Sequence, residues 1–457
     1  MTISDISIDD LITAVAGPVF VPGDEAYAAE TFAWNVAHQH TPLVVVGATS
    51  AADVAAAVRW AGQHGLAVAV QATGHGAVRP AESCVLVSTT RMQQLSVDPA
   101  TRTVRAGAGV RWSQVIEAAA PHGLAPLNGS SSNVGVVGYT LGGGMGPLGR
   151  AFGFAADHVR SVEIVTADGA VRTIDADREA DLFWAVRGGK GNFGIVTAIE
   201  FGLVEVATLY AGGIYFPATH AAEVLHRFRE WAPTLPERTS TSIAVLRLPP
   251  LPQLPEPLRG AFVVHLRFAH LGPASEGAEL LAPMRAAAPA VIDAVGELPY
   301  QAIDAVHQDP VDPMPSRERG ALLGDLSAST IDRLLEVAGP QVADIPVVMV
   351  ELRLMGGALS RPATVPNAVS GRGAAYSLFV IGLGVPELAP VVDAVSAGIV
   401  AAAAADTVPG GLVNFSGSAV HEALLANWSQ ADRDRLLRIK RSYDPTNLFS
   451  ANQALLA

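Results

Sequence analysis

The sequence has almost no cysteine and no long apolar run. Cys84 is the only cysteine in 457 residues, which excludes a disulfide framework and a metal site built from several cysteines. Cys84 lies in the apolar run 83–87, which is typical of a buried strand. No stretch reaches the ~20 apolar residues of a membrane-spanning helix. Residues 1–10 are acidic and lack the basic leader and apolar core of a secretion signal, so we expect a cytoplasmic protein that does not enter a membrane.

Positive charge is also scarce. Lysine and arginine number 30 against 43 aspartates and glutamates, for a net charge of −13. A surface that is negative on average repels nucleic acid and anionic membranes, so neither is expected as a partner. Half of the residues are hydrophobic, and a chain of this length can bury large cores in two domains.

Two common nucleotide-binding motifs are missing. There is no G-x-x-x-x-G-K-[S/T] loop, and no strand leads directly into G-x-G-x-x-G followed by a helix and a distant acidic residue. Among the functions considered, a nicotinamide-dependent enzyme of the Rossmann type is therefore the least favoured.

The first feature that is present is a histidine between two glycines. The apolar run 68–70 predicts a strand, and it leads through Gln71, Ala72 and Thr73 into Gly74-His75-Gly76. Glycine permits positive φ angles and close approach of a flat ligand, while an imidazole near neutrality offers a nucleophilic nitrogen. The alternative is a turn whose histidine is merely exposed.

A glycine-dense stretch follows at residues 128–150. Glycine is costly inside helices and strands, so we expect irregular backbone here. Successive bare amides can form a nest that holds a pyrophosphate without a cationic side chain. A flexible linker is the alternative, but the interleaved Val134, Val136, Val137 and Leu141 favour burial.

A third glycine turn, residues 188–194, separates an expected helix at 181–187 from an expected strand beginning at Ile195. Three such turns in one region indicate a single large cofactor. The other elements that we expect before residue 205 are helices at 8–15, 50–64 and 113–122, and strands at 42–46, 85–88, 94–97, 103–106, 161–166 and 171–174.

These three turns, together with Asp181-Leu182-Phe183-Trp184-Ala185 and the tail 443–449 with Asn452, resemble the FAD-linked oxidases of the vanillyl-alcohol oxidase superfamily, in particular the berberine-bridge-enzyme-like branch. The resemblance spans almost the whole chain. It implies an α+β fold in which a two-subdomain FAD-binding domain of the p-cresol methylhydroxylase type (1–205) is followed by a substrate domain (206–407), and the C-terminus (408–457) returns to the first domain.

The resemblance also implies the cofactor site. The histidine that matches His75 bonds covalently to the C8 methyl group of the flavin, and backbone amides hold the pyrophosphate. Many relatives add a second bond from a cysteine where this chain has Ser131, so we expect a single link; FAD bound without a covalent bond is the alternative. The expected FAD contacts are Gln71, Ala72, Thr73, Gly74, His75, Gly76, Ser131, Val134, Gly135, Gly138, Leu141, Gly142, Gly143, Gly144, Gly191, Gly194, Ile195, Val196, Asn414 and Asn452.

In this branch a hydride moves from a substrate carbon to flavin N5, a base takes the O–H or N–H proton, and O2 reoxidises the flavin to give peroxide. Val134 matches a small residue thought to leave room for O2, which favours an oxidase; Val134 as a packing residue only is the alternative. Three other functions stay open: a dehydrogenase with another acceptor, a non-catalytic flavin carrier, and the Rossmann enzyme above. The expected substrate class is a small organic alcohol or amine, with secondary metabolites included. Neither the identity of the substrate nor the oligomeric state is predicted.

The second half should form one antiparallel sheet with helices on one face. Expected strands are 209–216, 241–248, 260–269, 347–355 and 376–383, and expected helices are 218–231, 274–288, 329–337 and 388–405. The proline-rich segment 249–257 must be a loop. A basic amphipathic helix is expected at 428–443.

The resemblance implies an acidic base on the strand 347–355, so Glu351 is the candidate proton acceptor or amine anchor, with Arg353 as its partner. It shares one face of the strand 347–355 with Arg353, and a carboxylate on an apolar strand is costly unless it is paired or used. A satisfied ion pair with Arg353 at the domain interface is the alternative. Alcohol-oxidising relatives use a tyrosine from a Y-x-N-Y-like segment, but this chain has Leu412-Val413-Asn414-Phe415, which leaves Tyr139, Tyr300 and Tyr376 as tyrosine candidates. His307, Arg317 and Arg319 are expected in a proline-rich loop near the pocket.

Overall fold

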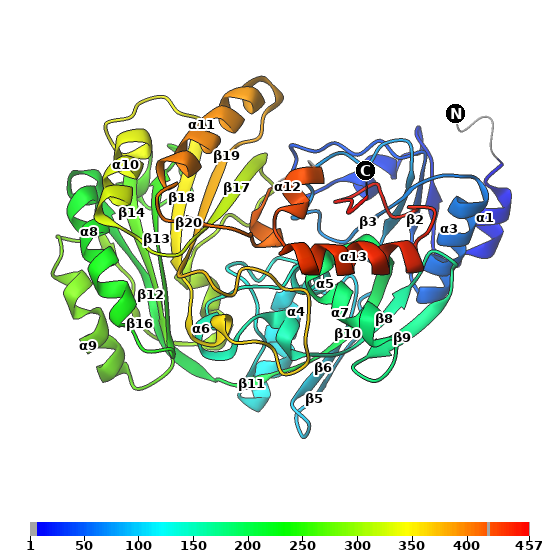
Figure 1. Ribbon diagram of the computed structural model, residues 1–457, viewed down its shortest axis with the longest axis horizontal. Coiled ribbons are helices and arrows are strands. Elements are labelled where there is room, and N and C mark those ends of the chain that lie inside the picture. The colour runs from blue at the N-terminus through cyan, green and yellow to red at the C-terminus, as the bar shows by residue number, and fades with distance from the viewer. Residues whose placement is uncertain (1–6, 418–420, 457) are drawn as a thin grey trace.

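The computed structural model describes residues 7–417 and 421–456. Residues 1–6, which carry most of the argument against a leader, lie outside the described part. Two lobes are visible in Figure 1: a first lobe built from the N-terminal half and the C-terminal tail, and a second lobe built from the residues between them. Together they give the α+β fold that the sequence predicts.

One sheet of the first lobe has the strand order β1-β2-β4-β3, with β2, β4 and β3 parallel. Helix α3 (Ala51–Gln63) packs against it through Val54, Val58 and Ala61. The helix begins at Ser50, whose hydroxyl accepts a hydrogen bond from the Asp53 amide, as an N-cap should. The strands are β1 (Val19–Phe20), β2 (Val44–Gly47), β3 (Val68–Gln71) and β4 (Val85–Ser88).

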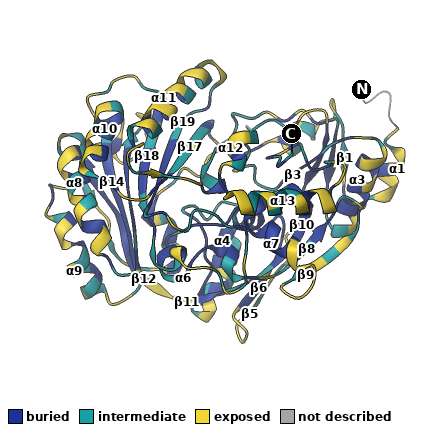
Figure 2. Ribbon diagram, in the orientation of Figure 1, coloured by how far each residue is buried: buried dark blue, intermediate teal, exposed yellow. Residues whose placement is uncertain are grey.

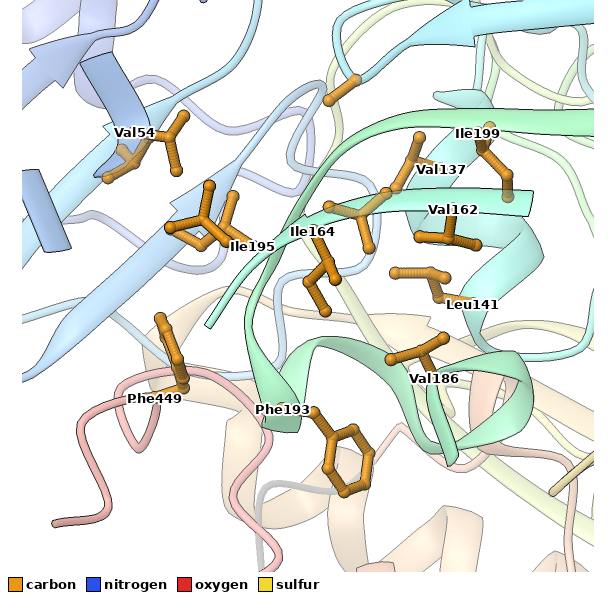
Figure 3. Close-up of a cluster of buried hydrophobic side chains, with 14 of the residues drawn as sticks. Val54, Val137, Leu141, Val162, Ile164, Val186, Phe193, Ile195, Ile199 and Phe449 are labelled. Carbon is orange, nitrogen blue, oxygen red and sulfur yellow. The ribbon is translucent and has the colours of Figure 1, made fainter. Parts of the chain in front are cut away.

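A second sheet of the first lobe is antiparallel, with the order β5-β6-β10-β8-β9. Its β8 and β10 side chains meet those of α5 and α7 in the core shown in Figure 3, where Val162, Ile164 and Ile199 face Leu141 and Val186. The elements are β5 (Leu95–Asp98), β6 (Thr103–Gly107), β8 (Val159–Val165), β9 (Val171–Asp175), β10 (Ile195–Gly202), α4 (Trp112–Ala119), α5 (Val136–Leu141) and α7 (Ala180–Gly189).

Helix α5 corrects one expectation, because it lies inside the glycine-dense stretch that was expected to be irregular throughout. Its sequence VVGYTL is mostly apolar, and four of its six residues are buried. Burial of that face outweighs the cost of the single Gly138 in the helix.

The second lobe is an antiparallel sheet with the order β15-β12-β14-β13-β18-β19-β17-β20, and β16 pairs with β12. Figure 2 shows exposed surfaces on the helices that cover one face of it, as predicted. The helices are α8 (Ala221–Trp231), α9 (Ala274–Arg285), α10 (Ala328–Ala338) and α11 (Ala389–Ala402). The strands are β12 (Thr208–Pro217), β13 (Thr239–Arg247), β14 (Phe262–His270), β15 (Ile292–Asp293), β16 (Gly296–Pro299), β17 (Ser316–Leu323), β18 (Val347–Leu354), β19 (Tyr376–Leu383) and β20 (Thr407–Val408).

Strand β17 was missed from the sequence. Arg317 and Arg319 were expected in a loop, but they lie on β17, which pairs with β19 along its whole length. Strand β17 carries a residue of the site described below.

The C-terminal tail is fixed by a buried ion pair. Lys440 of helix α13 (Gln430–Tyr443) and Asp444, the residue that follows the helix, are fully buried and joined at 2.5 Å. Asp444 also accepts hydrogen bonds from the amides of Leu448 and Phe449. The Leu448 carbonyl then accepts from the Val68 amide, which ties the tail to β3.

The smaller elements are α1 (Asp9–Ala14), α2 (Tyr27–Thr31), α6 (Gly149–Phe152), α12 (His421–Leu425), and the paired strands β7 (Leu124–Ala125) and β11 (Val204–Glu205). Across residues 7–417 and 421–456, no helix is both long and apolar enough to cross a membrane.

Candidate active site

A cavity of about 390 Å³ lies where the two lobes and the C-terminal tail meet. Its wall is formed by the turn after β3, the glycine-dense stretch, the glycine turn before β10, and strands β17, β18 and β19. Of the residues expected to contact FAD, those in the wall are Gln71, Ala72, Thr73, Gly74, His75, Gly76, Ser131, Val134, Gly135, Gly138, Leu141, Gly191, Gly194, Val196, Asn414 and Asn452.

The wall does not include Gly142, Gly143, Gly144 or Ile195. Ile195 is 1% exposed and belongs to the core of Figure 3. A Cβ on Gly142 would lie 2.0 Å from Asn414 Oδ1, and one on Gly144 would lie 2.5 Å from the Tyr139 ring. Protein side chains thus pack against these two glycines, and their assignment as FAD contacts stays a prediction.

His75 is held in a fixed orientation at the cavity wall. Its ring stacks on Trp34, with centroids 4.4 Å apart and planes 13° apart. Its Nδ1 lies 3.0 Å from Thr73 Oγ1. Burial, helped by the charge of Arg111, lowers the His75 pKa to about 4, so the imidazole is neutral and nucleophilic at neutral pH. Gly74 has φ +75, and a Cβ there would collide with the Ala33 backbone at 2.6 Å, so the turn requires glycine.

The Tyr139 side chain packs against glycines of the stretch 128–150 to which it belongs. Cβ atoms on Gly129, Gly144 or Gly146 would approach its ring or hydroxyl within 2.8, 2.5 and 3.1 Å respectively. The hydroxyl is buried without a hydrogen-bond partner among the described residues. Burial raises its pKa far above the usual value, so it is not readily ionised. Tyr139 contributes to the wall, but its hydroxyl is poorly suited to accept a proton.

Glu351 is 1% exposed and fully engaged. It accepts hydrogen bonds from Arg267 Nη1 at 2.6 Å, Ser242 Oγ at 2.7 Å and Arg353 Nη2 at 3.0 Å. The two guanidinium groups hold its pKa well below the usual range. A carboxylate stabilised in this way is a poor proton acceptor, so the geometry favours the ion-pair alternative over the role of base.

Arg353 reaches further than Glu351. It donates to the Met145 carbonyl of the first lobe at 3.3 Å, and its guanidinium lies 5.4 Å from the centre of the Phe415 ring in the cavity wall. The pair therefore joins the lobes, and Arg353 alone of the two faces the cavity.

An apolar wall stands near Arg353. Phe379 of β19 meets Phe415 edge to face at 4.9 Å, and Ile381 and Val413 lie in the same wall. None of these four residues carries a hydroxyl, so this side of the cavity offers no phenolic group.

The three polar residues expected near the pocket lie outside the large cavity. Arg317 is bound to Asp393 of α11 at 2.8 Å, and Arg319 is exposed. His307 is 6% exposed and lines a separate small space at the lobe interface, together with Arg353. Tyr300 is also remote, since its hydroxyl donates to the Pro126 carbonyl at 2.6 Å.

Charged wall residues that were missed from the sequence are Arg79, Lys190, Asp309 and Glu318. Glu318 lies on β17 and Lys190 lies in the glycine turn before β10. Strand β17 was not predicted because it begins with the polar run Ser316-Arg317-Glu318-Arg319. The apolar residues Leu322 and Leu323 at its end were the one indication of a strand. Lys190 was not predicted because the glycines around it were interpreted only as a turn.

Two segments of the chain match models of known protein families. Residues 42–175 match the model of an FAD binding domain, and residues 426–455 match the model described as berberine and berberine like. The chain thus combines an FAD-binding domain with a berberine-like segment, which supports an FAD-dependent oxidoreductase. Both matched segments lie in the first lobe, whose residues form most of the cavity wall.

Among the relatives is (R)-6-hydroxynicotine oxidase of Paenarthrobacter nicotinovorans, 32% identical over 226 residues, which are 49% of this chain and 46% of that protein. The match thus spans about half the length of this curated relative. An FAD-linked oxidoreductase of Bacillus subtilis is 26% identical over 97% of both chains.

Two solved structures share the architecture. The 6-hydroxy-D-nicotine oxidase of Arthrobacter nicotinovorans has a TM-score of 0.82 at 26% identity, over 98% of this chain and 99% of that one. The BBE-like 1 protein of Physcomitrella patens has a TM-score of 0.83 at 20% identity, over 99% of this chain and 100% of that one, which shows the common fold.

The wall of the cavity fits FAD. Six of the glycines in it are among the expected FAD contacts. Cβ atoms on four of them, Gly76, Gly135, Gly138 and Gly191, would meet no protein atom closer than 3.6 Å, so their bare backbone borders free space. Neutral His75 and exposed backbone amides suit a flavin and a diphosphate respectively. The glycines are Gly74, Gly76, Gly135, Gly138, Gly191 and Gly194.

Proposed function

We propose that this protein is an FAD-dependent oxidase whose flavin is covalently linked through His75 alone and which oxidises a small organic alcohol or amine, with O2 as the final acceptor and H2O2 as a product. The observation that carries the proposal is His75: a neutral imidazole, oriented by Trp34 and Thr73, at the wall of a cavity lined by bare glycine backbone. Bound FAD supplies the two-electron oxidant.

The protein's own residues would bind and orient. Glycine amides of the three turns hold the diphosphate, and two asparagines fix the surrounding segments. Asn452 accepts from the Val70 amide at 2.9 Å, and Asn414 donates to the Tyr139 carbonyl at 2.8 Å. Val134 would leave room for O2 beside the flavin, and Ser131, which has no thiol, would form no second bond.

The wall favours a substrate with an apolar or aromatic part. Phe379, Ile381 and Phe415 line one side of the cavity, with Arg353 beside them. Relatives of the same fold include a xylooligosaccharide oxidase and the nicotine-derivative oxidases. Phe379, Ile381 and Phe415 offer no group that binds a sugar hydroxyl, so an alcohol or amine on an aromatic or aliphatic body fits this side of the cavity better.

The test is a screen of aromatic and aliphatic alcohols and amines against the purified yellow protein. We expect at least one compound to bleach the flavin without air, and the colour to return in air with release of peroxide. Bleaching with slow return of colour in air, but rapid return with an added acceptor dye, would replace the oxidase by a dehydrogenase. A flavin that dithionite bleaches and no compound does would contradict the proposal.

A further inference from the structure

Lys190 occupies a backbone conformation that suits glycine. Its φ is +57 and its ψ is −153, in a region that residues with a Cβ rarely adopt. Gly189 and Gly191 flank it. A glycine at position 190 would remove the strain, so the lysine side chain is present in spite of an unfavourable backbone.

The Lys190 side chain lies between two of the glycine turns. A Cβ on Gly142 would come within 2.8 Å of its Cε, and a Cβ on Gly76 would lie 3.7 Å from its ammonium nitrogen. Both positions therefore leave room for this side chain. Burial lowers the Lys190 pKa to about 8, and the charge of Glu318 opposes that fall.

Glu318 faces the same cavity from the second lobe. It lies on β17 opposite Ile381 of β19, which is also in the wall. Its hydrogen bond from Ser316 Oγ is long, at 3.5 Å. Burial raises the Glu318 pKa to about 7, and the charge of Lys190 opposes that rise.

The charges around Glu318 can be traced element by element. On its own strand, Arg317 points to the opposite face, where it is bound to Asp393 of α11, and Arg319 is exposed. Strand β19 presents Phe379 and Ile381, which carry no charge. The 413–417 segment, which packs against β17, presents the uncharged residues Val413, Asn414, Phe415 and Gly417. The remaining charged wall residues are His40, His75, Arg79, Lys190, Asp309 and Arg353.

We infer that Glu318 is the proton acceptor of the oxidation and that Lys190 is a positioning residue that holds and tunes its charge. This inference rests on the proposed function. The proton of the substrate hydroxyl or amine moves to the Glu318 carboxylate while the bond from carbon to oxygen or nitrogen becomes double. The hydrogen on that carbon leaves with its electron pair to bound FAD, the oxidant. Glu318 then loses the proton to water, so that all atoms and electrons of the step are accounted for.

The contrast with Glu351 supports this choice. Glu351 has three close donors that fix it as an anion, whereas Glu318 has one long hydrogen bond and an apolar neighbour in the wall. A base must change its protonation state near the working pH, and only the second environment permits that.

The experiment uses the FAD-loaded enzyme, a compound that the screen finds, and Glu318→Gln. The matched control is Glu336→Gln, the same chemical change at an exposed position of α10. Without air, flavin reduction in the unmodified enzyme should accelerate with pH through a break near 7. Glu318→Gln should be at least about 100-fold slower and lack the break, since that is the typical contribution of a positioned base. Glu336→Gln should match the unmodified enzyme.

Lys190→Met removes the charge but leaves a side chain of similar length. The break should then move to higher pH, because the positive charge that lowers the Glu318 pKa is gone. A merely structural lysine would leave the break in place.

A second readout does not need turnover. Infrared difference spectra between pH 8 and pH 6 should show a carboxyl group that gains a proton near pH 7 in the unmodified enzyme and not in Glu318→Gln. Rapid reduction of Glu318→Gln with the break retained would overturn the inference, as would the absence of that carboxyl signal. Failure of the oxidase proposal looks different, because then no compound bleaches even the unmodified enzyme.

Discussion

Glu351 and Glu318 lie on strands β18 and β17, which flank β19 in one sheet, yet their surroundings are opposite. Glu351 is enclosed by Arg267, Arg353 and Ser242, and its pKa falls well below the usual range. Glu318 faces an open cavity across from a single lysine, and its pKa rises to about 7. Burial alone does not decide whether a carboxylate is structural or reactive. The number of hydrogen-bond donors that are buried beside it decides.

The largest expected effect concerns stability, and it separates the two carboxylates. Glu351→Gln leaves two buried guanidinium groups without their anion, so the free energy of unfolding should fall by about 3–5 kcal/mol. Glu318→Gln should not lower it, because the native state loses only a long hydrogen bond. Urea unfolding of both variants measures the difference. Equal losses would contradict the distinction.

The pH dependence of stability should also have opposite signs. The Glu318 pKa is raised from 4.5 to about 7, so its contribution to stability is present below pH 4.5 and is lost as pH rises towards 7. The Glu351 pKa is lowered from 4.5, so its contribution is present above that pH and is lost as pH falls below it. Between pH 4.5 and 7, the free energy of unfolding of Glu318→Gln should therefore change less with pH than that of the unmodified protein. Urea unfolding at several pH values measures this dependence.

A smaller effect tests the strain at Lys190. Lys190→Gly relieves the backbone and should raise the free energy of unfolding by about 1 kcal/mol, after the greater freedom of glycine in the unfolded chain is subtracted. Lys190→Met keeps the strained backbone and should gain no comparable stability from it. Thermal unfolding of the two variants separates the effect of strain from the effect of charge. If Lys190→Met is more stable than Lys190→Gly, the backbone at residue 190 is not strained.

The sequence predicted most of the fold because its strands and helices carry regular apolar patterns. Strand β17 was missed because neither face is apolar at its start: Glu318 faces a cavity, and Arg317 pairs with Asp393 of α11. Helix α5 was missed because Gly138 and its glycine neighbours outweighed four buried residues.

Prediction of the site was limited by long-range contacts. The turn around His75 is local and was visible in the sequence. The second guanidinium on Glu351 comes from Arg267, 84 residues away, so the pairing with Arg353 alone understated how firmly that carboxylate is held. Lys190 and Glu318 are far apart in the sequence and lie in different lobes. Only the arrangement of the lobes brings them to one cavity.

The covalent bond through His75 is the central claim, and acid precipitation tests it most directly. We expect the yellow colour to stay in the washed pellet of the unmodified protein and to pass into the supernatant with His75→Ala. Mass spectrometry of the peptide that contains residue 75 should then show added flavin only in the unmodified protein. Colour in the supernatant of the unmodified protein, or an unmodified His75 peptide, would contradict the account.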